Sequence, residues 1–494
     1  MNIQILPTSI TVLYLLLCIG IGIYAKRLEK SGTSHEYLTG GGGVGFWVNG
    51  FAIFAAFATG GTMMGNMGVS YAGGWGYIMA YNGGVAVGYV ITVFYLAKIF
   101  RNMSVSTVPE FIKVRFNSKL LNIVIPIVLI LTLGAYVVAQ MKIGGLIGER
   151  LLGIPYTWSV VIIGIVYIFY TAYGGMKAVT LTDFFQGLLM IGVVIVTGII
   201  ALMYGSGPID LYSAAQAIKP SWTTSETYPY IAYLGAFIVW ATAVTVLPHT
   251  VMRIFAAKDE KTGRASLTLG LGLYIVTCVV TLILVVGSTM VVTGGIALPD
   301  ADTAFLVFLE ELTPSWIEGI AFAAIFAAVM SSVSAMLLAL GAAFAYDLIG
   351  TVKPDYPEEK KRKLVPISIV VFGIITMLFA FNPPALLSLL YSAAMGLLAS
   401  TLFFPLLLGV WWKRMNKEGA LAAALSGAIS YLILFFAFDL PALSEIVYAL
   451  PISLVFAVGV TLLTPEPTEK ELRRMTIAHQ REFLPEDIEP VEPV

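Results

Sequence analysis

The chain has 494 residues, of which 58% are hydrophobic and 12% are charged, and its mean hydropathy is +0.89. A soluble domain carries about 25% charged residues, so the composition excludes an ordinary soluble protein and indicates many membrane-spanning helices. The net charge of −1 excludes a strongly basic nucleic-acid-binding protein, and two cysteines in apolar segments provide no disulfide framework.

A helix needs about 20 apolar residues to cross the hydrocarbon core. Because the first apolar segment has no cleavage site after it, we expect it to be a retained helix. The segments 205–228 and 295–314 are expected to be extramembrane loops, and residues 465–494 a polar cytoplasmic tail that follows one transmembrane domain, 1–464. Thirteen spans are predicted in chain order: 5–25, 46–72, 75–100, 120–148, 156–174, 178–204, 229–256, 265–294, 315–348, 364–381, 385–412, 418–438 and 441–463.

The basic residues predict the orientation. If the N-terminus is outside and the spans alternate, every Lys and Arg except Lys142, Arg150 and Lys219 lies on the cytoplasmic side. We therefore expect a multi-pass plasma-membrane protein with its N-terminus outside and its C-terminus in the cytoplasm.

No catalytic motif is present. The "GGGGVG" segment at 40–45 lacks the Lys-Ser/Thr of a phosphate-binding loop and is expected to be a flexible start to the second span. There is no HExxH, no cysteine cluster and no GxSxG, and the three histidines are scattered. The sequence therefore predicts that the protein is not an enzyme.

The second span contains adjacent glycines, Gly60 and Gly61, between Thr59 and Thr62. Each glycine costs about 1 kcal/mol in a helix interior, so the pair predicts a break that frees carbonyl oxygens for a cation. Close helix packing through small residues is the alternative explanation.

The ninth span contains three hydroxyls, Ser331, Ser332 and Ser334, among apolar residues. Ser331 and Ser334 share a helix face. Such hydroxyls either bond back to carbonyls three or four residues earlier or, as we hypothesise here, coordinate Na⁺ against the broken second span.

Two charged residues also fall within predicted spans. Asp183 lies about 9 Å inside one end of its helix, and it either marks a functional site or pairs with a nearby polar group. Lys142 either extends its side chain outward to the membrane surface or faces a cavity together with Gln140, where it would attract an anion.

Four segments in order over residues 5–460 resemble the sodium/solute symporter family, which includes proline, pantothenate, acetate, sialic acid and sugar symporters. They are "GGGGVGFWVNGFAIFAAFA", "YTAYGGMKAVTLTDFFQG", "LPHTVMRIFAAKD" and "IFAAVMSSVSAML". The first segment and "AYVVAQM" are most similar to the acetate and monocarboxylate branch, whereas the Pro-His-Thr segment is equally similar to the pantothenate branch.

The resemblance implies an all-α fold with a ten-helix inverted-repeat (5+5) core of the leucine-transporter type that works by alternating access. The first repeat would cover about 46–204 and the second about 229–412. The main Na⁺ site would use carbonyls of Ala55, Ala58 and Ala328 with the hydroxyls of Ser331 and Ser332. A second Na⁺ site would use Asp183 and Ser334, although Ala335 replaces one expected hydroxyl.

The resemblance also guides the choice of substrate. Phe57 stands where the proline branch has an aspartate, and we predict Na⁺-coupled symport of a small organic solute, namely a monocarboxylate-type anion. Pocket candidates that could face the helix break are Thr59, Thr62, Tyr77, Tyr81, Asn82, Gln140, Lys142, Trp240, Thr242, Thr245, Tyr391 and Ser392.

Several alternatives remain at this stage. The solute could be pantothenate or proline, or a carrier of the same fold could couple to H⁺ through Asp183. A channel would favour symmetric pore-lining rings, and a sensor would need a signalling domain larger than the 465–494 tail. No nucleic acid or obligatory protein partner is predicted.

Overall fold

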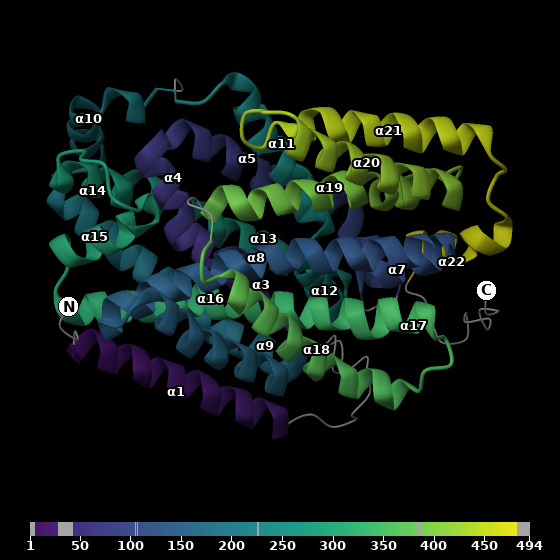
Figure 1. The fold of residues 1–494 in the computed structure, drawn as a ribbon, viewed down its shortest axis with the longest axis horizontal. Coiled ribbons are helices and arrows are strands. Elements are labelled where there is room, and N and C mark those ends of the chain that lie inside the picture. Colours follow the sequence, from purple (N-terminus) through teal and green to yellow (C-terminus); the bar gives the residue numbers. More distant parts are fainter. Residues whose placement is uncertain are drawn as a thin grey trace.

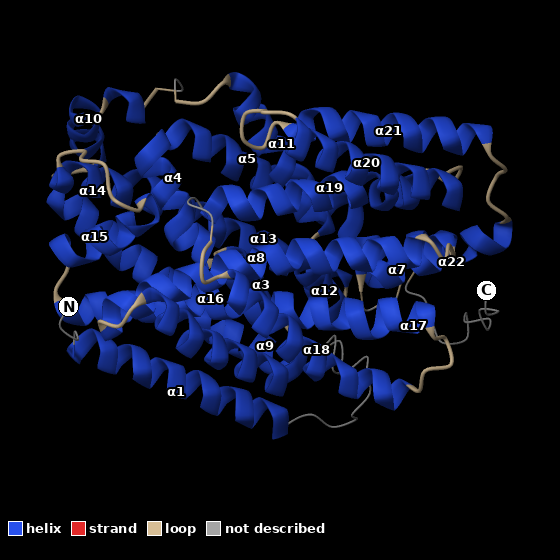
Figure 2. Ribbon diagram, viewed as in Figure 1, coloured by secondary structure: helices blue, strands red, loops and turns tan. Residues whose placement is uncertain are grey.

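The computed structural model describes residues 5–27, 43–103, 105, 107–224, 227–383 and 387–481. Throughout these residues the elements are helices, and the one strand-like contact is an isolated bridge between Val44 and Ala257 (Figure 2). Residues 40–42 of the predicted glycine-rich segment and the end of the tail, 482–494, lie outside the described residues.

The helices up to the middle of the chain are α1 (Ile5–Arg27), α3 (Phe46–Phe57), η1 (Gly61–Gly65), α4 (Asn66–Gly73), α5 (Trp75–Ile91), η2 (Thr92–Leu96), α6 (Ala97–Asn102), α7 (Val108–Phe116), α8 (Leu121–Leu152), α9 (Tyr156–Tyr204), α10 (Pro208–Ile218), η3 (Pro220–Trp222), α11 (Tyr230–Val246) and α12 (Pro248–Ala256). The remaining helices are α13 (Glu260–Val279), η4 (Val280–Val285), α14 (Val286–Thr293), η5 (Ala301–Thr303), α15 (Ala304–Leu312), α16 (Ser315–Ala342), η6 (Ala343–Leu348), α17 (Ile349–Val352), α18 (Glu358–Phe379), α19 (Leu387–Trp411), α20 (Lys417–Ala437), α21 (Glu445–Leu463) and α22 (Glu469–Gln480).

Twelve of the thirteen predicted spans have a counterpart among the candidate membrane-spanning helices. Among the described residues, 11 helices are long and apolar enough to cross a membrane, and the bent pair formed by α3 and Gly61–Gly73 is a further candidate. The 23-residue helix α1 corresponds to the predicted first span. Helix α9, with 49 residues, contains two candidate spans, Tyr156–Tyr173 and Val179–Tyr204, which correspond to the predicted fifth and sixth spans.

Three segments predicted to be loops or tail contain helices. Residues 205–228 include α10, residues 295–314 include α15, and α22 begins with a capping box in which Thr468 and Glu471 satisfy each other's backbone N–H groups. These helices are short and amphipathic or polar, so a search for long apolar segments does not detect them. Figure 1 shows α10, α14 and α15 at one end of the helix bundle and α7, α17 and α22 at the other.

Helix α16 forms the centre of the bundle. Every residue of its apolar window is buried, and it packs against α1, α8, α9 and α18. The three serines therefore lie inside the protein and away from lipid, where a hydroxyl must find a protein partner, water or an ion.

Close helix contacts depend on small residues, as at the crossing of α5 and α11. A Cβ atom at Gly84 would collide with the carbonyl oxygen of Phe237, whereas one at neighbouring Gly83 would lie 3.7 Å from the Phe237 ring. The two backbones can approach this closely because position 84 has no side chain.

We expect Gly84→Ala to destabilise the protein by about 1–3 kcal/mol, because the added methyl group forces α5 and α11 apart. Gly83→Ala is the matched control and should leave stability unchanged or slightly higher. Thermal unfolding of both variants in detergent measures the difference, and equal unfolding temperatures for the two variants would contradict this account of the crossing.

Candidate functional site

The second span is broken where the sequence predicted. Helix α3 ends at Phe57 and the chain resumes as a helix at Gly61, with a bend of 54° between the two parts. The hydroxyl of Thr62 donates to the Phe57 carbonyl at 3.0 Å, and the Thr59 hydroxyl accepts the backbone N–H of Thr62 at 3.3 Å. The two threonines therefore replace part of the helical hydrogen bonding that the break removes.

A second interruption occurs in the seventh span. Leu247 has an extended backbone, with φ −64° and ψ 115°, between α11 and α12, and Pro248 follows it. Proline has no N–H to donate to the preceding turn and disfavours a helical conformation in the residue before it. The two interruptions thus fall in the first span of each predicted repeat.

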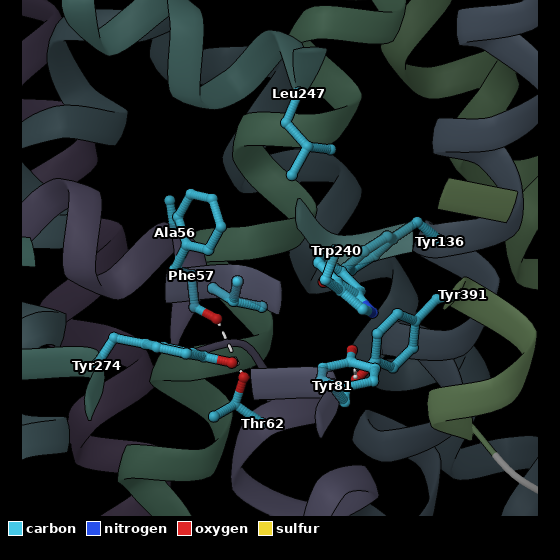
Figure 3. A pocket seen from close by; sticks show the side chains of 10 residues that line it. Ala56, Phe57, Thr62, Tyr81, Tyr136, Trp240, Leu247, Tyr274 and Tyr391 are labelled. Carbon is cyan, nitrogen blue, oxygen red and sulfur yellow. Dashed lines mark hydrogen bonds between the residues drawn. The ribbon is translucent and has the colours of Figure 1, made fainter. Parts of the chain in front are cut away.

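Both interruptions line the same cavity (Figure 3). Its lining residues, none of which is charged, are Ala56, Phe57, Thr62, Tyr81, Val85, Tyr136, Trp240, Leu247, Tyr274 and Tyr391. The cavity measures about 10 Å³, which is room for about one water molecule. An organic solute is larger than this cavity, so it can occupy the cavity only after the surrounding helices move apart.

Aromatic hydroxyls connect the cavity walls. The hydroxyl of Tyr81 donates to that of Tyr391 at 3.0 Å, and Tyr391 in turn donates to the side-chain oxygen of Asn66 at 3.0 Å. The Trp240 indole N–H donates to Ser392 at 3.2 Å, so α4, α5, α11 and α19 are connected by polar groups. These groups can both donate and accept, which suits recognition of a polar solute inside an apolar enclosure.

Oxygen atoms from α3 and α16 meet beside the break. The Ser331 hydroxyl donates to the carbonyl of Ala55 at 2.8 Å and to that of Ala328 at 3.1 Å, and the Ser332 hydroxyl donates to Ala328 at 2.8 Å. Ala58, the residue that directly follows α3, is also fully buried. Local bonding within α16 therefore occurs, but Ser331 also connects α16 to the broken helix.

Asp183 and Ser334 are bonded to different partners. Ser334 donates to the Ser331 carbonyl at 3.1 Å. Asp183 forms a fully buried ion pair with Arg253 of α12, whose carbonyl also accepts a hydrogen bond from Asn49 of α3. The structure thus corresponds to the alternative in which the carboxylate pairs with a nearby basic group, and it does not join Asp183 and Ser334 by a hydrogen bond.

Lys142 does not line the cavity. Its ammonium group lies 3.1 Å from Asp302 and 3.2 Å from Asp300, two residues that directly precede α15. Two aspartates from the 295–314 segment engage its charge in this structure, and the expectation that Lys142 attracts an anionic solute stays a prediction.

The other pocket candidates are distributed between the cavity and its surroundings. Thr62, Tyr81, Trp240 and Tyr391 line it, while Asn82 and Ser392 bond to lining residues. Thr59 lies in the break itself. Tyr77 packs against Tyr228 and Tyr233, and the hydroxyls of Thr242 and Thr245 bond to carbonyls of their own helix. Gln140 is buried beside Gly60.

Sequence reasoning missed three polar residues of this region: Asn66, Tyr136 and Tyr274. Tyr136 was detectable, because it lies one helical turn before Gln140 and therefore on the same face of α8. Tyr274 bonds to Asn82, but no feature of the eighth span marks one face of α13 as facing a cavity.

The family model of the sodium:solute symporter family matches residues 37–427. The sodium/pantothenate symporter of Escherichia coli (strain K12) is 29% identical over 86% of this chain and 89% of its own length. The osmoregulated proline transporter OpuE of Bacillus subtilis (strain 168) is 27% identical over 93% of this chain and 95% of its own length. The Staphylococcus aureus sodium/proline symporter (strain JH9) is 27% identical over 92% of each chain.

Solved structures share the fold. A Na⁺-coupled sialic acid symporter in a substrate-bound, outward-open state superposes with a TM-score of 0.80 at 21% identity, over 94% of this chain and 99% of that one. A nucleobase-cation-symport-1 family transporter in a closed conformation gives 0.55 at 16% identity, over 89% and 97%. These identities establish the fold alone.

The chain therefore belongs to the sodium:solute symporter family. It is a multi-pass membrane transporter, not an enzyme, and it couples movement of a small organic solute to Na⁺.

The buried ion pair provides a stability prediction. Removing one partner of such a pair leaves an uncompensated charge and costs about 3–5 kcal/mol, so Asp183→Asn should lower the unfolding temperature markedly. The double variant Asp183→Asn/Arg253→Gln removes both charges and should recover part of the loss. Thermal unfolding in detergent tests this, and a double variant that is no more stable than the single one would contradict it.

Proposed function

We propose that the transported Na⁺ binds between the broken second span and α16. Its ligands are the carbonyl oxygens of Ala55, Ala58 and Ala328 and the hydroxyls of Ser331 and Ser332. The observation that supports this assignment is the set of hydrogen bonds at 2.8–3.1 Å that already joins four of these five residues. On Na⁺ binding, each serine hydroxyl rotates so that its proton points away from the carbonyls. The lone pairs of its oxygen then face the ion.

The chemistry of these groups fits Na⁺. All five are neutral oxygen ligands, buried and supplied by two elements that the break brings together, and hard monovalent cations favour such oxygens. Asp183 is engaged by Arg253, so the proposal rests on the main site alone and omits a second one.

We further propose that residues 46–204 and 229–412 are the two inverted repeats and that the N-terminus is outside. Support for the repeats comes from the paired interruptions at 58–60 and 247, because helices broken at corresponding positions mark the midplane site of such transporters. Support for the orientation is the distribution of basic residues in the sequence.

For the solute, we propose a small organic acid with one carboxylate and no ammonium group. None of the ten cavity-lining residues is acidic, so the cavity offers no charged partner for the ammonium group of an amino acid such as proline. Tyrosine hydroxyls, the indole N–H and the backbone N–H groups at the start of the second half-helix can all donate to a carboxylate.

Electrostatics couples the two ligands. A neutral site that takes up Na⁺ gains one positive charge beside a cavity with no charged side chain in its lining. Opposite unit charges about 6 Å apart, at an effective dielectric constant of about 20, attract by about 3 kcal/mol. This attraction strengthens the binding of each ligand by the same factor, as linkage requires.

Uptake by purified protein in liposomes tests the substrate class. With an inward Na⁺ gradient we expect accumulation of one of labelled acetate, pyruvate, lactate or pantothenate, and none of proline. Proline should not accumulate because the cavity lining has no acidic residue to pair with its ammonium group. Proline as the only accumulated solute would overturn the proposed class, and uptake driven by a pH gradient without Na⁺ would point to the H⁺-coupled alternative.

Ser332→Ala tests the Na⁺ site. Loss of one oxygen ligand should raise the Na⁺ concentration for half-maximal uptake by about tenfold, the equivalent of about 1.4 kcal/mol. Ser368→Ala is the matched control, because Ser368 is also buried and bonds back within its own helix, to Leu364 of α18. An unchanged Na⁺ dependence in Ser332→Ala would remove this residue from the site.

A further inference from the structure

Gln140 is a buried amide whose two polar atoms have no hydrogen-bond partner. The residue is 0% exposed on α8, and neither its side-chain oxygen nor its side-chain nitrogen is bonded. Leaving a buried polar group unsatisfied costs about 1–3 kcal/mol, and native proteins keep few such groups. In this structure the Gln140 amide can therefore accept a new hydrogen-bond partner without losing an existing one.

The amide lies against the helix break. A Cβ atom built on Gly60 would be 2.9 Å from the Gln140 side-chain oxygen, and it would also touch Val329 of α16 and Ile143 of α8. Val329 directly follows Ala328, which is one of the proposed Na⁺ ligands. Gln140 thus occupies the junction of α8, α16 and the break, and Gly60 leaves the space that the amide needs.

The same face of α8 reaches the cavity. Tyr136, one turn earlier, lines the cavity and its ring packs 4.8 Å from that of Tyr391. The cavity of about 10 Å³ cannot hold even a small organic acid, so it must widen when solute enters. Gln140 is the next polar group along this face of α8.

We propose that Gln140 is the specificity-determining residue that binds the carboxylate of the transported acid. Its side-chain N–H₂ donates to a carboxylate oxygen in the loaded state, while its side-chain oxygen remains toward the break. This inference rests on the proposed function, in which the solute is a carboxylate. The amide of Gln140 is uncharged, so the positive charge that attracts the carboxylate comes from the adjacent Na⁺. The acid should therefore bind well only when Na⁺ is bound.

A structural role and a recognition role of Gln140 predict opposite changes in the unfolding temperature of Gln140→Leu. If the amide stabilised the fold, this variant would unfold at a lower temperature. If the amide is reserved for solute, Gln140→Leu removes an unsatisfied group and keeps a similar volume, so the solute-free protein should unfold at the same temperature or higher. Gln186→Leu is the stability comparison, because Gln186 donates to the Tyr14 hydroxyl at 3.0 Å and should lose stability when changed.

The transport experiment measures the apparent KM for the accumulated acid in liposomes. We expect Gln140→Leu to raise this KM by about tenfold to a hundredfold, the value of one hydrogen bond to a charged group. Thr132→Val on the same helix is the control and should keep the wild-type KM, since the Thr132 hydroxyl donates to the carbonyl of Val128 at 2.8 Å, within α8. Unfolding temperatures with and without Na⁺ and acid add a readout that needs no transport.

Each outcome decides between the two roles. A raised KM, with Na⁺-induced stabilisation retained and acid-induced stabilisation lost, supports the inference. An unchanged KM in Gln140→Leu overturns it, as does a lower unfolding temperature without loss of acid-induced stabilisation. If the wild-type protein accumulates none of the acids, the proposed substrate class fails. That result differs from wild-type uptake with an unchanged KM in Gln140→Leu, which rejects only the role of Gln140.

Discussion

The unpaired backbone groups at the break of the second span are the constraint on which the rest of the site depends. In a membrane interior each unsatisfied N–H or C=O costs several kcal/mol, so the backbone groups that lose their helical partners at the break require other partners. Thr59 and Thr62 supply some, and Ser331 supplies another by bonding to the Ala55 carbonyl across to α16. Two of the oxygens in this arrangement, the Ser331 hydroxyl and the Ala55 carbonyl, are also proposed ligands of the ion.

The buried charged side chains lie outside the cavity lining. Two buried ion pairs among the described residues do not line the cavity: Lys142 with Asp300 and Asp302 next to α15, and Asp183 with Arg253 of α12. The cavity itself is lined by uncharged side chains. Any net charge at the centre is therefore brought by the transported species themselves, which makes occupancy by one sensitive to occupancy by the other.

The fold was largely predictable because its signals are local and strong. Hydropathy located the spans, and the adjacent glycines located the first break. The aspects that could not be predicted depend on which helix faces meet. Asp183 and Arg253 are 70 residues apart, and Lys142 and Asp302 are 160 apart, so no spacing rule shows that they pair. For the same reason Asn66 and Tyr274 remained unrecognised, whereas Thr62, Tyr81, Trp240 and Tyr391 were detectable by their place near the midplane.

The neutral centre also bears on the energetics of accumulation. One Na⁺ that moves with a monovalent acid transfers no net charge, so the membrane potential contributes nothing and a tenfold Na⁺ gradient supplies about 1.4 kcal/mol, enough for about tenfold accumulation. A second Na⁺ would add a net charge and about 2.3 kcal/mol per 100 mV. The buried pairing of Asp183 with Arg253 withholds the one carboxylate predicted for a second ion. Under the proposal of one Na⁺ and one monovalent acid, transport is therefore electroneutral while this pair is intact.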